Sequence, residues 1–168
     1  MSRSVEFDAF VASRSRALLQ TAWLLTGDWQ HAEDLVQTAL AKCYPAWERI
    51  ADGGDEGYVR RTLVTSYITW WRRAWHGERP SDPIPETGVA TDDLAAVDVR
   101  RLLVAALGEL PRRQRATVVL RYYCDLPEVE TAELLGCSVG TVKSQAAKGL
   151  ARLRRSSLAA ALSEGIAG

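Results

Sequence analysis

The feature that most constrains the fold is a proline-containing, acidic stretch at 78–96, which has helical periodicity on either side of it. It holds Pro80, Pro83, Pro85 and Gly88. Proline fixes φ and lacks a backbone N–H group, so closely spaced prolines end a helix and favour an extended linker. We therefore expect two folded parts joined by a linker over 78–96. One domain with a long surface loop is the alternative.

Both flanking regions are predicted to be helical, because apolar residues recur at three- and four-residue spacing and alternating Val, Ile and Thr runs are nearly absent. Pro45 should end or kink the second helix. The fold class is therefore all-α. Two small helical domains are expected at 1–77 and 97–162, followed by a short tail at 163–168. The helices are expected at 5–26, 29–44, 57–76, 96–108, 112–124, 127–135 and 139–162.

Composition restricts the class of protein. Of the 168 residues, 47% are hydrophobic and 25% are charged, as in an ordinary folded protein. No apolar run approaches the ~18 residues of a membrane span, and Glu6 and Asp8 interrupt the apolar residues where a signal peptide would begin. Three widely spaced cysteines and two histidines argue against disulfides or a metal site. We expect a cytoplasmic protein with no cofactor and no membrane insertion.

The net charge of zero conceals a strong asymmetry along the chain. Residues 1–79 carry ten basic and ten acidic side chains, and 80–99 carry five acidic and no basic ones. Residues 100–168 carry eleven basic against six acidic side chains. A basic region attracts polyanions and an acidic segment repels them. The C-terminal part is therefore the candidate for binding nucleic acid.

The clearest motif lies at 127–155. A helix-turn-helix needs a small residue where its helices cross, a turn residue that tolerates positive φ, and an apolar anchor in its second helix. Ala132, Gly136 and Val142 meet these three needs, and Ser138 is placed to cap the second helix. The sequence therefore predicts a helix-turn-helix here.

The second helix of this motif has a basic face, and no acidic residue occurs between Cys137 and Ser163. Hydroxyls and cations on one face suit the major groove of DNA. A solvated amphipathic helix is the alternative. In projection, the residues opposite the apolar stripe are Thr141, Ser144, Lys148, Arg152 and Arg155.

Two helices of the N-terminal part also carry candidate surfaces. The helix at 58–76 has a Trp-rich apolar arc and an acid-free arc of Thr, Ser and Arg, which suits opened DNA because aromatics stack on splayed bases. Trp70 and Trp71 are expected in the core. The helix at 31–47 presents a stripe with Asp34 and Gln37 that suits docking on a basic helix, with a solvated face as the alternative.

These features together resemble the bacterial sigma factors of the extracytoplasmic-function group, closest to the actinobacterial branch. The resemblance covers about residues 5–160 and rests on A-E-D-L-V-Q at 32–37, L-x-x-L-P-x-x-x-R at 107–115, and G-T-V-K-S at 140–144 followed by L-A-R-L-R. It implies a non-catalytic subunit that binds core RNA polymerase, directs it to promoters and helps to open the minus-ten element. An anti-sigma partner is left open.

The resemblance also implies roles for particular residues. Asp34 and Gln37 would grip the coiled coil of the polymerase β′ subunit, and helices around 107–122 would sit on the β flap. The loop at 51–57 would capture a flipped base. The minus-ten element would be contacted by Arg61, Thr65, Ser66, Thr69 and Arg73. The minus-thirty-five element would be contacted by Thr141, Lys143, Ser144, Lys148 and Arg152.

Three positions depart from the family pattern. His31 replaces a usual Asp, Thr65 a frequent Asn, and Gln145 a frequent Arg. These departures bear on docking strength and promoter sequence.

Three other classes compete with this interpretation. A stand-alone helix-turn-helix regulator would bind duplex DNA unaided, usually as a dimer. The cationic, Trp-rich helix at 58–75 argues against it, because a sensor domain has no need of such a face. An adaptor that does not read DNA is disfavoured by the basic recognition helix, and no cluster of residues argues for an enzyme.

Overall fold

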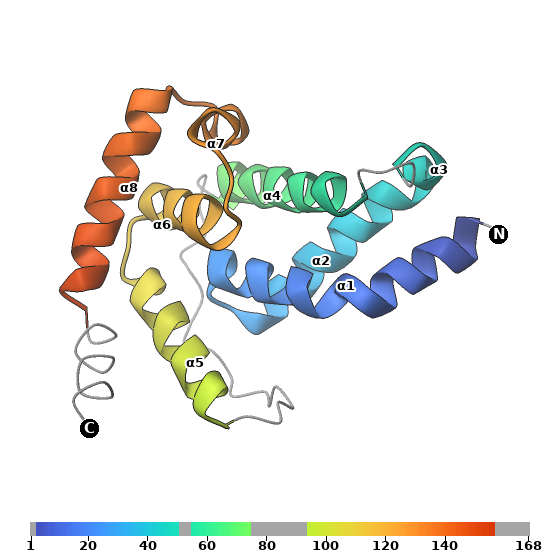
Figure 1. Ribbon diagram of the computed structural model, residues 1–168, viewed down its shortest axis with the longest axis horizontal. Helices are drawn as coiled ribbons and strands as arrows, with labels where there is room; N and C mark the ends of the chain where they lie inside the picture. The colour runs from blue at the N-terminus through green and yellow to red at the C-terminus, as the bar shows by residue number, and fades with distance from the viewer. Residues whose placement is uncertain (1–2, 51–54, 75–93, 157–168) are drawn as a thin grey trace. The chain divides into compact units, whose positions relative to one another are not determined.

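The computed structural model describes residues 3–50, 55–74 and 94–156. All regular structure in these ranges is helical, which confirms the all-α prediction (Figure 1). The chain divides into two compact units, Met1–Ile84 and Pro85–Gly168, called unit 1 and unit 2 below. Most of the expected linker lies outside the described residues, although α5 (Leu94–Gly108) already begins at 94.

Unit 1 is built around α2 (Trp29–Cys43), which packs along both α1 (Arg3–Thr26) and α4 (Asp55–Ala74) (Figure 1). Gly27, at a φ of 75°, ends α1. Asp28 then caps α2, where its Oδ1 accepts the Gln30 N–H at 2.8 Å. Because this side chain satisfies an otherwise unpaired donor, the chain turns within two residues and the helices pack closely. The buried core includes Leu25, Leu35, Ala39, Leu63 and Val64.

The second helix ends at Pro45 as predicted, since the α-helix α2 stops at Cys43, two residues before the proline. The chain continues through a 3₁₀ turn, η1 (Tyr44–Ala46), into the short helix α3 (Trp47–Ile50). Proline is tolerated here because it occupies the first turn, where its missing N–H group has no intrahelical partner.

Aromatic packing holds this segment against the start of α1. Trp47 is 2% exposed, and the centroid of its ring lies 5.2 Å from that of Phe7 and 4.9 Å from that of Phe10. The Arg3 guanidinium lies 4.8 Å from the centre of the Tyr44 ring. Contacts between residues this far apart in sequence explain why the sequence pattern did not reveal α3.

Unit 2 comprises α5, α6 (Arg112–Val118), the π-helical turn η2 (Val119–Tyr123), α7 (Glu128–Leu135) and α8 (Val139–Arg154). α8 packs against α6 and α7 (Figure 1). The predicted helix at 112–124 thus ends in a wider turn, closed by a 2.9 Å bond from Cys124 N–H to the Val119 carbonyl. In a π turn the backbone hydrogen bond spans five residues instead of the four of an α-helix, and this changes the direction in which the following side chains point.

The predicted helix at 139–162 is too long. α8 ends at Arg154, where the N–H groups of Arg155 and Ser156 donate to the carbonyls three residues back, each at 3.1 Å. Such bonds tighten the last turn and stop an α-helix. The remainder of the predicted helix, from 157, lies outside the described residues.

Candidate nucleic-acid interfaces

The helix-turn-helix of unit 2 has the predicted geometry. Gly136 adopts the left-handed conformation at φ 67° and ψ 39°, and the Cys137 N–H donates to the Ala132 carbonyl at 3.0 Å. This hydrogen bond and the left-handed glycine close the C-terminal end of α7. Ala132 and Val142 are 5% and 0% exposed, so the two helices meet through the expected small and apolar residues.

Ser138 fixes the start of α8. Its Oγ accepts the Thr141 N–H at 3.1 Å and lies 3.0 Å from the Thr141 hydroxyl. The cap therefore holds Thr141 as well as the helix, and leaves the Thr141 side chain half-buried. One hydroxyl thus supports both the fold of the motif and the position of a candidate DNA contact.

The outer face of α8 is cationic and free of carboxylates. Ser144, Lys148 and Arg152 are exposed along it. Neither cation has a carboxylate partner among the residues that the structure describes. Both charges are therefore available to a polyanion.

Lys143 lies on a different flank of α8. At about 100° per residue, Lys143 and Thr141 point about 160° apart around the helix axis. The Lys143 ammonium lies 3.8 Å from Glu128 Oε2 of α7. The geometry therefore does not bring Lys143 onto the face formed by Ser144 and Lys148.

A second cationic face runs along α4. Arg61, Thr65, Thr69 and Arg73 are exposed, as is Arg72. The Thr65 hydroxyl donates to the Arg61 carbonyl at 2.6 Å, and the Thr69 hydroxyl donates to the Thr65 carbonyl at 2.9 Å. With their protons engaged, both hydroxyls present acceptor lone pairs outward.

Ser66 does not belong to this exposed face. It is 1% exposed, and its Oγ accepts a hydrogen bond from Lys42 Nζ at 3.1 Å. Projection explains the difference, since Ser66 lies only about 20° around the helix from Val59, which is fully buried. Ser66 therefore connects α4 to α2, and its predicted position among the DNA-facing residues is corrected.

The tryptophans of α4 are less buried than expected. Trp70 and Trp71 are both half-buried, and the Trp71 ring stacks on Tyr67 at 6.4 Å between centroids. Trp75 and most of the loop at 51–57 lie outside the described residues.

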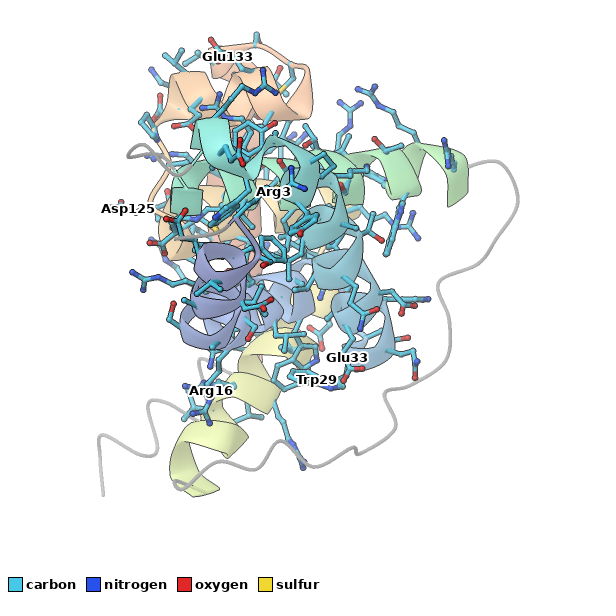
Figure 2. All side chains as sticks on the ribbon, turned by 90° about the vertical axis from the view of Figure 1, so that its right-hand side faces the viewer. Arg3, Arg16, Trp29, Glu33, Asp125 and Glu133 are labelled. Atoms are coloured by element: carbon cyan, nitrogen blue, oxygen red, sulfur yellow. The ribbon has the colours of Figure 1, made fainter. Side chains whose placement is uncertain are left out.

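The outer face of α2 carries Asp34 and Gln37, both exposed, while Leu35 and Ala39 on the opposite side are fully buried. Sequence reasoning missed Glu33, which is exposed and lies about 40° around the helix from Gln37. Figure 2 shows Glu33 close to Trp29 at the N-terminal end of α2. Glu33 adds a second carboxylate to this face, and its position at i−4 from Gln37 was a signal in the sequence.

Cys43 closes the inner side of α2. It is fully buried, and this burial raises the pKa of its thiol, an effect that a hydrogen bond with the Thr62 side chain partly offsets. A raised pKa keeps the thiol neutral and unreactive, as suits a core residue.

The described residues contain no group of three His, Cys, Asp or Glu side chains that could hold a metal ion. No helix among them is long and apolar enough to cross a membrane.

Two family models match the chain, Sigma-70 region 2 at 10–77 and Sigma-70, region 4 at 100–153. The chain is 41% identical over 157 residues to an RNA polymerase sigma-E factor of Streptomyces coelicolor, covering 92% of this chain and 87% of that protein. It is 30% identical over 150 residues to the ECF RNA polymerase sigma factor SigM of Mycobacterium tuberculosis, covering 89% and 76%.

A solved structure of CnrH in complex with the cytosolic domain of CnrY is also similar. The TM-score is 0.58 at 22% identity, over 89% of this chain and 85% of that one. At this identity the likeness concerns the fold.

Proposed function

The chain belongs to the extracytoplasmic-function group of sigma-70 factors, and from this membership we propose how its two units divide the recognition of a promoter. As a sigma factor it binds core RNA polymerase, directs it to specific promoters and helps to open the minus-ten element. We assign polymerase docking and the minus-ten element to unit 1, and the minus-thirty-five element to unit 2.

The acid-free face of α8 carries the assignment of unit 2. The Ser138 cap positions Thr141, and the exposed Ser144, Lys148 and Arg152 continue that face. Small hydroxyls at base edges and cations at bases or phosphates are the contacts that a recognition helix makes in a major groove. Lys143 is left out of this set because it points to the other flank.

For the minus-ten element the proposal uses the exposed face of α4. Arg61 and Arg73 would follow the backbone of the opened strand, and Thr65 and Thr69 would accept hydrogen bonds from bases. Thr65 makes fewer hydrogen bonds than an Asn would, which should alter the preferred sequence at its contact. Ser66 is excluded by its burial.

For polymerase docking the proposal uses the outer face of α2. Asp34 and Gln37 would meet the basic coiled coil of the β′ subunit, and Glu33 would add a carboxylate to the contact. The helices around 107–122 would meet the β flap. Because core RNA polymerase acts in the cytoplasm, a chain that binds it would also be located there.

No catalytic residue is assigned, because the polymerase performs the chemistry. An anti-sigma protein is a further proposed partner. It is supported by the similar fold of CnrH, whose solved structure holds the cytosolic domain of CnrY.

Co-elution with bacterial core RNA polymerase on a sizing column tests the assignment, together with two double variants. Asp34→Ala with Gln37→Ala should weaken the complex. Ser144→Ala with Lys148→Ala should leave the complex intact and weaken recognition of the minus-thirty-five element. Loss of both activities in the Ser144 and Lys148 variant would contradict the division between the units. Unchanged polymerase affinity in the Asp34 and Gln37 variant would remove these two residues from the docking surface.

A control sigma factor known to bind the same polymerase must co-elute under the same salt. If it does and this chain does not, the alternative of a stand-alone regulator is favoured. That regulator would bind duplex DNA without polymerase, as a dimer on paired half-sites.

A further inference from the structure

Unit 1 holds a cation that the proposed minus-ten contacts do not include. Lys42 lies in the last turn of α2 and is exposed. Its Nζ donates a hydrogen bond to Ser66 Oγ of α4 at 3.1 Å. The ammonium group therefore lies against α4, although the residue belongs to α2.

The place of Lys42 on α2 explains this reach. At about 100° per residue, Lys42 lies only about 20° around the helix from Leu35, which is fully buried. The aliphatic stem of a lysine can follow such a boundary while its charged end stays in water. By the same projection, Lys42 lies about 80° from Asp34 and about 140° from Gln37. It is therefore separate from the proposed polymerase contact.

The contact with Ser66 places the ammonium group beside the proposed DNA-facing side of α4. Thr69 and Arg73 follow Ser66 by three and seven residues, so they lie on or next to the same stripe of the helix. Both residues are exposed. At about 1.5 Å per residue, Arg73 is about 10 Å farther along the helix axis than Ser66. Lys42 thus adds a second positive charge along this edge of α4.

The charge of Lys42 has no carboxylate partner in the described part of the chain. Within residues 3–50, 55–74 and 94–156, no Asp or Glu forms an ion pair with it. A lysine ammonium group has three N–H donors, and Ser66 accepts one of them. The other two donors can bind the oxygen atoms of a phosphate group.

A structural role alone does not require the charge. The buried Ser66 hydroxyl needs a hydrogen-bond partner, which an uncharged donor could also supply. A cation in the last turn of α2 does interact favourably with the helix dipole. This structural role is the alternative to be tested.

We propose that Lys42 binds a backbone phosphate of the opened minus-ten strand, next to the contacts made by α4. Cationic side chains that follow the backbone beside the bases are typical of sites for single-stranded DNA. Lys42 and Arg73 would bind phosphates at two points along the strand, and Thr69 between them would face the bases. The inference rests on the proposed function, because it requires the minus-ten element to lie on α4.

The test uses the full chain in its complex with core RNA polymerase. The probe is a fluorescent single-stranded oligonucleotide with the minus-ten sequence of a promoter mapped for this complex, and anisotropy gives its affinity at several salt concentrations. Lys42→Gln removes the charge and keeps an N–H donor for Ser66. We expect this variant to bind about fivefold more weakly. The slope of log affinity against log salt should become shallower by about 0.7, the contribution of one phosphate of a single strand.

The slope separates a phosphate contact from a structural role. If Lys42 only joins α2 to α4, Lys42→Gln will leave the slope unchanged and any loss of affinity will be equal at every salt concentration. That result would overturn the inference. Lys42→Arg and Ser66→Ala both keep the positive charge, so both should keep the original slope.

Arg16→Gln is the matched control for net charge. Arg16 is exposed and lies about 160° around α1 from the buried Leu18, on the side away from the core of unit 1. Its variant should change neither the affinity nor the slope. A change of slope equal to that of Lys42→Gln would show a general effect of charge and would contradict a contact at Lys42.

Arg73→Gln separates this inference from the proposed function. Arg73 is already assigned to the minus-ten strand, so its variant should lower the affinity and the slope by similar amounts. If Arg73→Gln has this effect and Lys42→Gln does not, α4 contacts the strand and only the inference about Lys42 is wrong. If neither variant has an effect, the minus-ten element does not lie on this side of α4, and the proposed function of α4 fails as well.

Discussion

At the scale of single residues, Gly149 shows how closely α8 approaches α6. A Cβ atom added there would lie 2.6 Å from Val118 Cγ2 and 3.4 Å from the Gln114 carbonyl oxygen. Val118 is buried and β-branched, so it cannot rotate away easily. Only glycine lets the two helices pack at this distance.

Gly149→Ala should therefore destabilise the protein. Overpacking costs about 1–3 kcal/mol, and the better helix propensity of Ala returns up to about 1 kcal/mol. Gly140→Ala in the same helix is the matched control, because its added Cβ would meet only the Ser138 Oγ at 3.8 Å. Thermal unfolding should show a lower midpoint for the first variant and an equal or higher one for the second. Equal effects of both would contradict the close approach.

Ser66 and Thr69 differ at the same scale, because one is buried against Lys42 and the other is exposed. Ser66→Ala should leave promoter opening nearly unchanged. Thr69→Ala should reduce opening about fivefold, the effect of losing roughly 1 kcal/mol of hydrogen bonding. Fluorescence of 2-aminopurine placed in the minus-ten element measures this in the complex with core polymerase. An equal loss in the two variants would restore Ser66 to the DNA-facing set.

At the scale of elements, the start of α8 joins stability to DNA contact. Ser138→Ala removes the cap and should cost about 1 kcal/mol of unfolding free energy. Ser138→Asp keeps the cap, since Asp accepts the same N–H group, but adds a negative charge beside Thr141. The Asp variant should keep its stability and lose affinity for the minus-thirty-five element. Full affinity of the Asp variant for the minus-thirty-five element would show that the DNA does not contact the N-terminal end of α8.

Elements were predictable wherever their signals were local. The break at Gly27 and Asp28, the turn at Gly136 and the Ser138 cap all depend on residues within a few positions, and the structure has each of them. The elements that escaped depend on distant contacts. α3 is held by α1 through Trp47, and no local pattern marks the widened turn at η2.

The candidate surfaces were predictable to the same extent. Projection gave the angle of each side chain around its helix, which was enough to place Ser144 and Lys148 outward. It could not say where a neighbouring helix begins to cover that angle. Ser66, which stands at the edge of the polar arc, lies against the Lys42 side chain for this reason. Lys143 was assigned by the family resemblance, although projection alone already places it about 160° from Thr141.

At the scale of the whole molecule, the charge distribution predicts a measurable salt dependence. Residues 100–168 hold eleven basic against six acidic side chains, while 1–79 are balanced. Each phosphate neutralised at a duplex contributes about −0.9 to the slope of log affinity against log salt, because a condensed counterion is released. The exposed cations of α8 should therefore govern the slope for the minus-thirty-five element.

Lys148→Ala with Arg152→Ala should make that slope shallower by about 2. The measurement is promoter affinity of the complex with core polymerase at several salt concentrations, where the contribution of the polymerase cancels between variants. Arg154→Ala is the matched control, because it removes a cation from the same helix on the flank away from the DNA. An unchanged slope in the double variant would show that these cations do not replace counterions on the DNA. An equal change in the control would show that net charge, rather than the face of α8, sets the salt dependence.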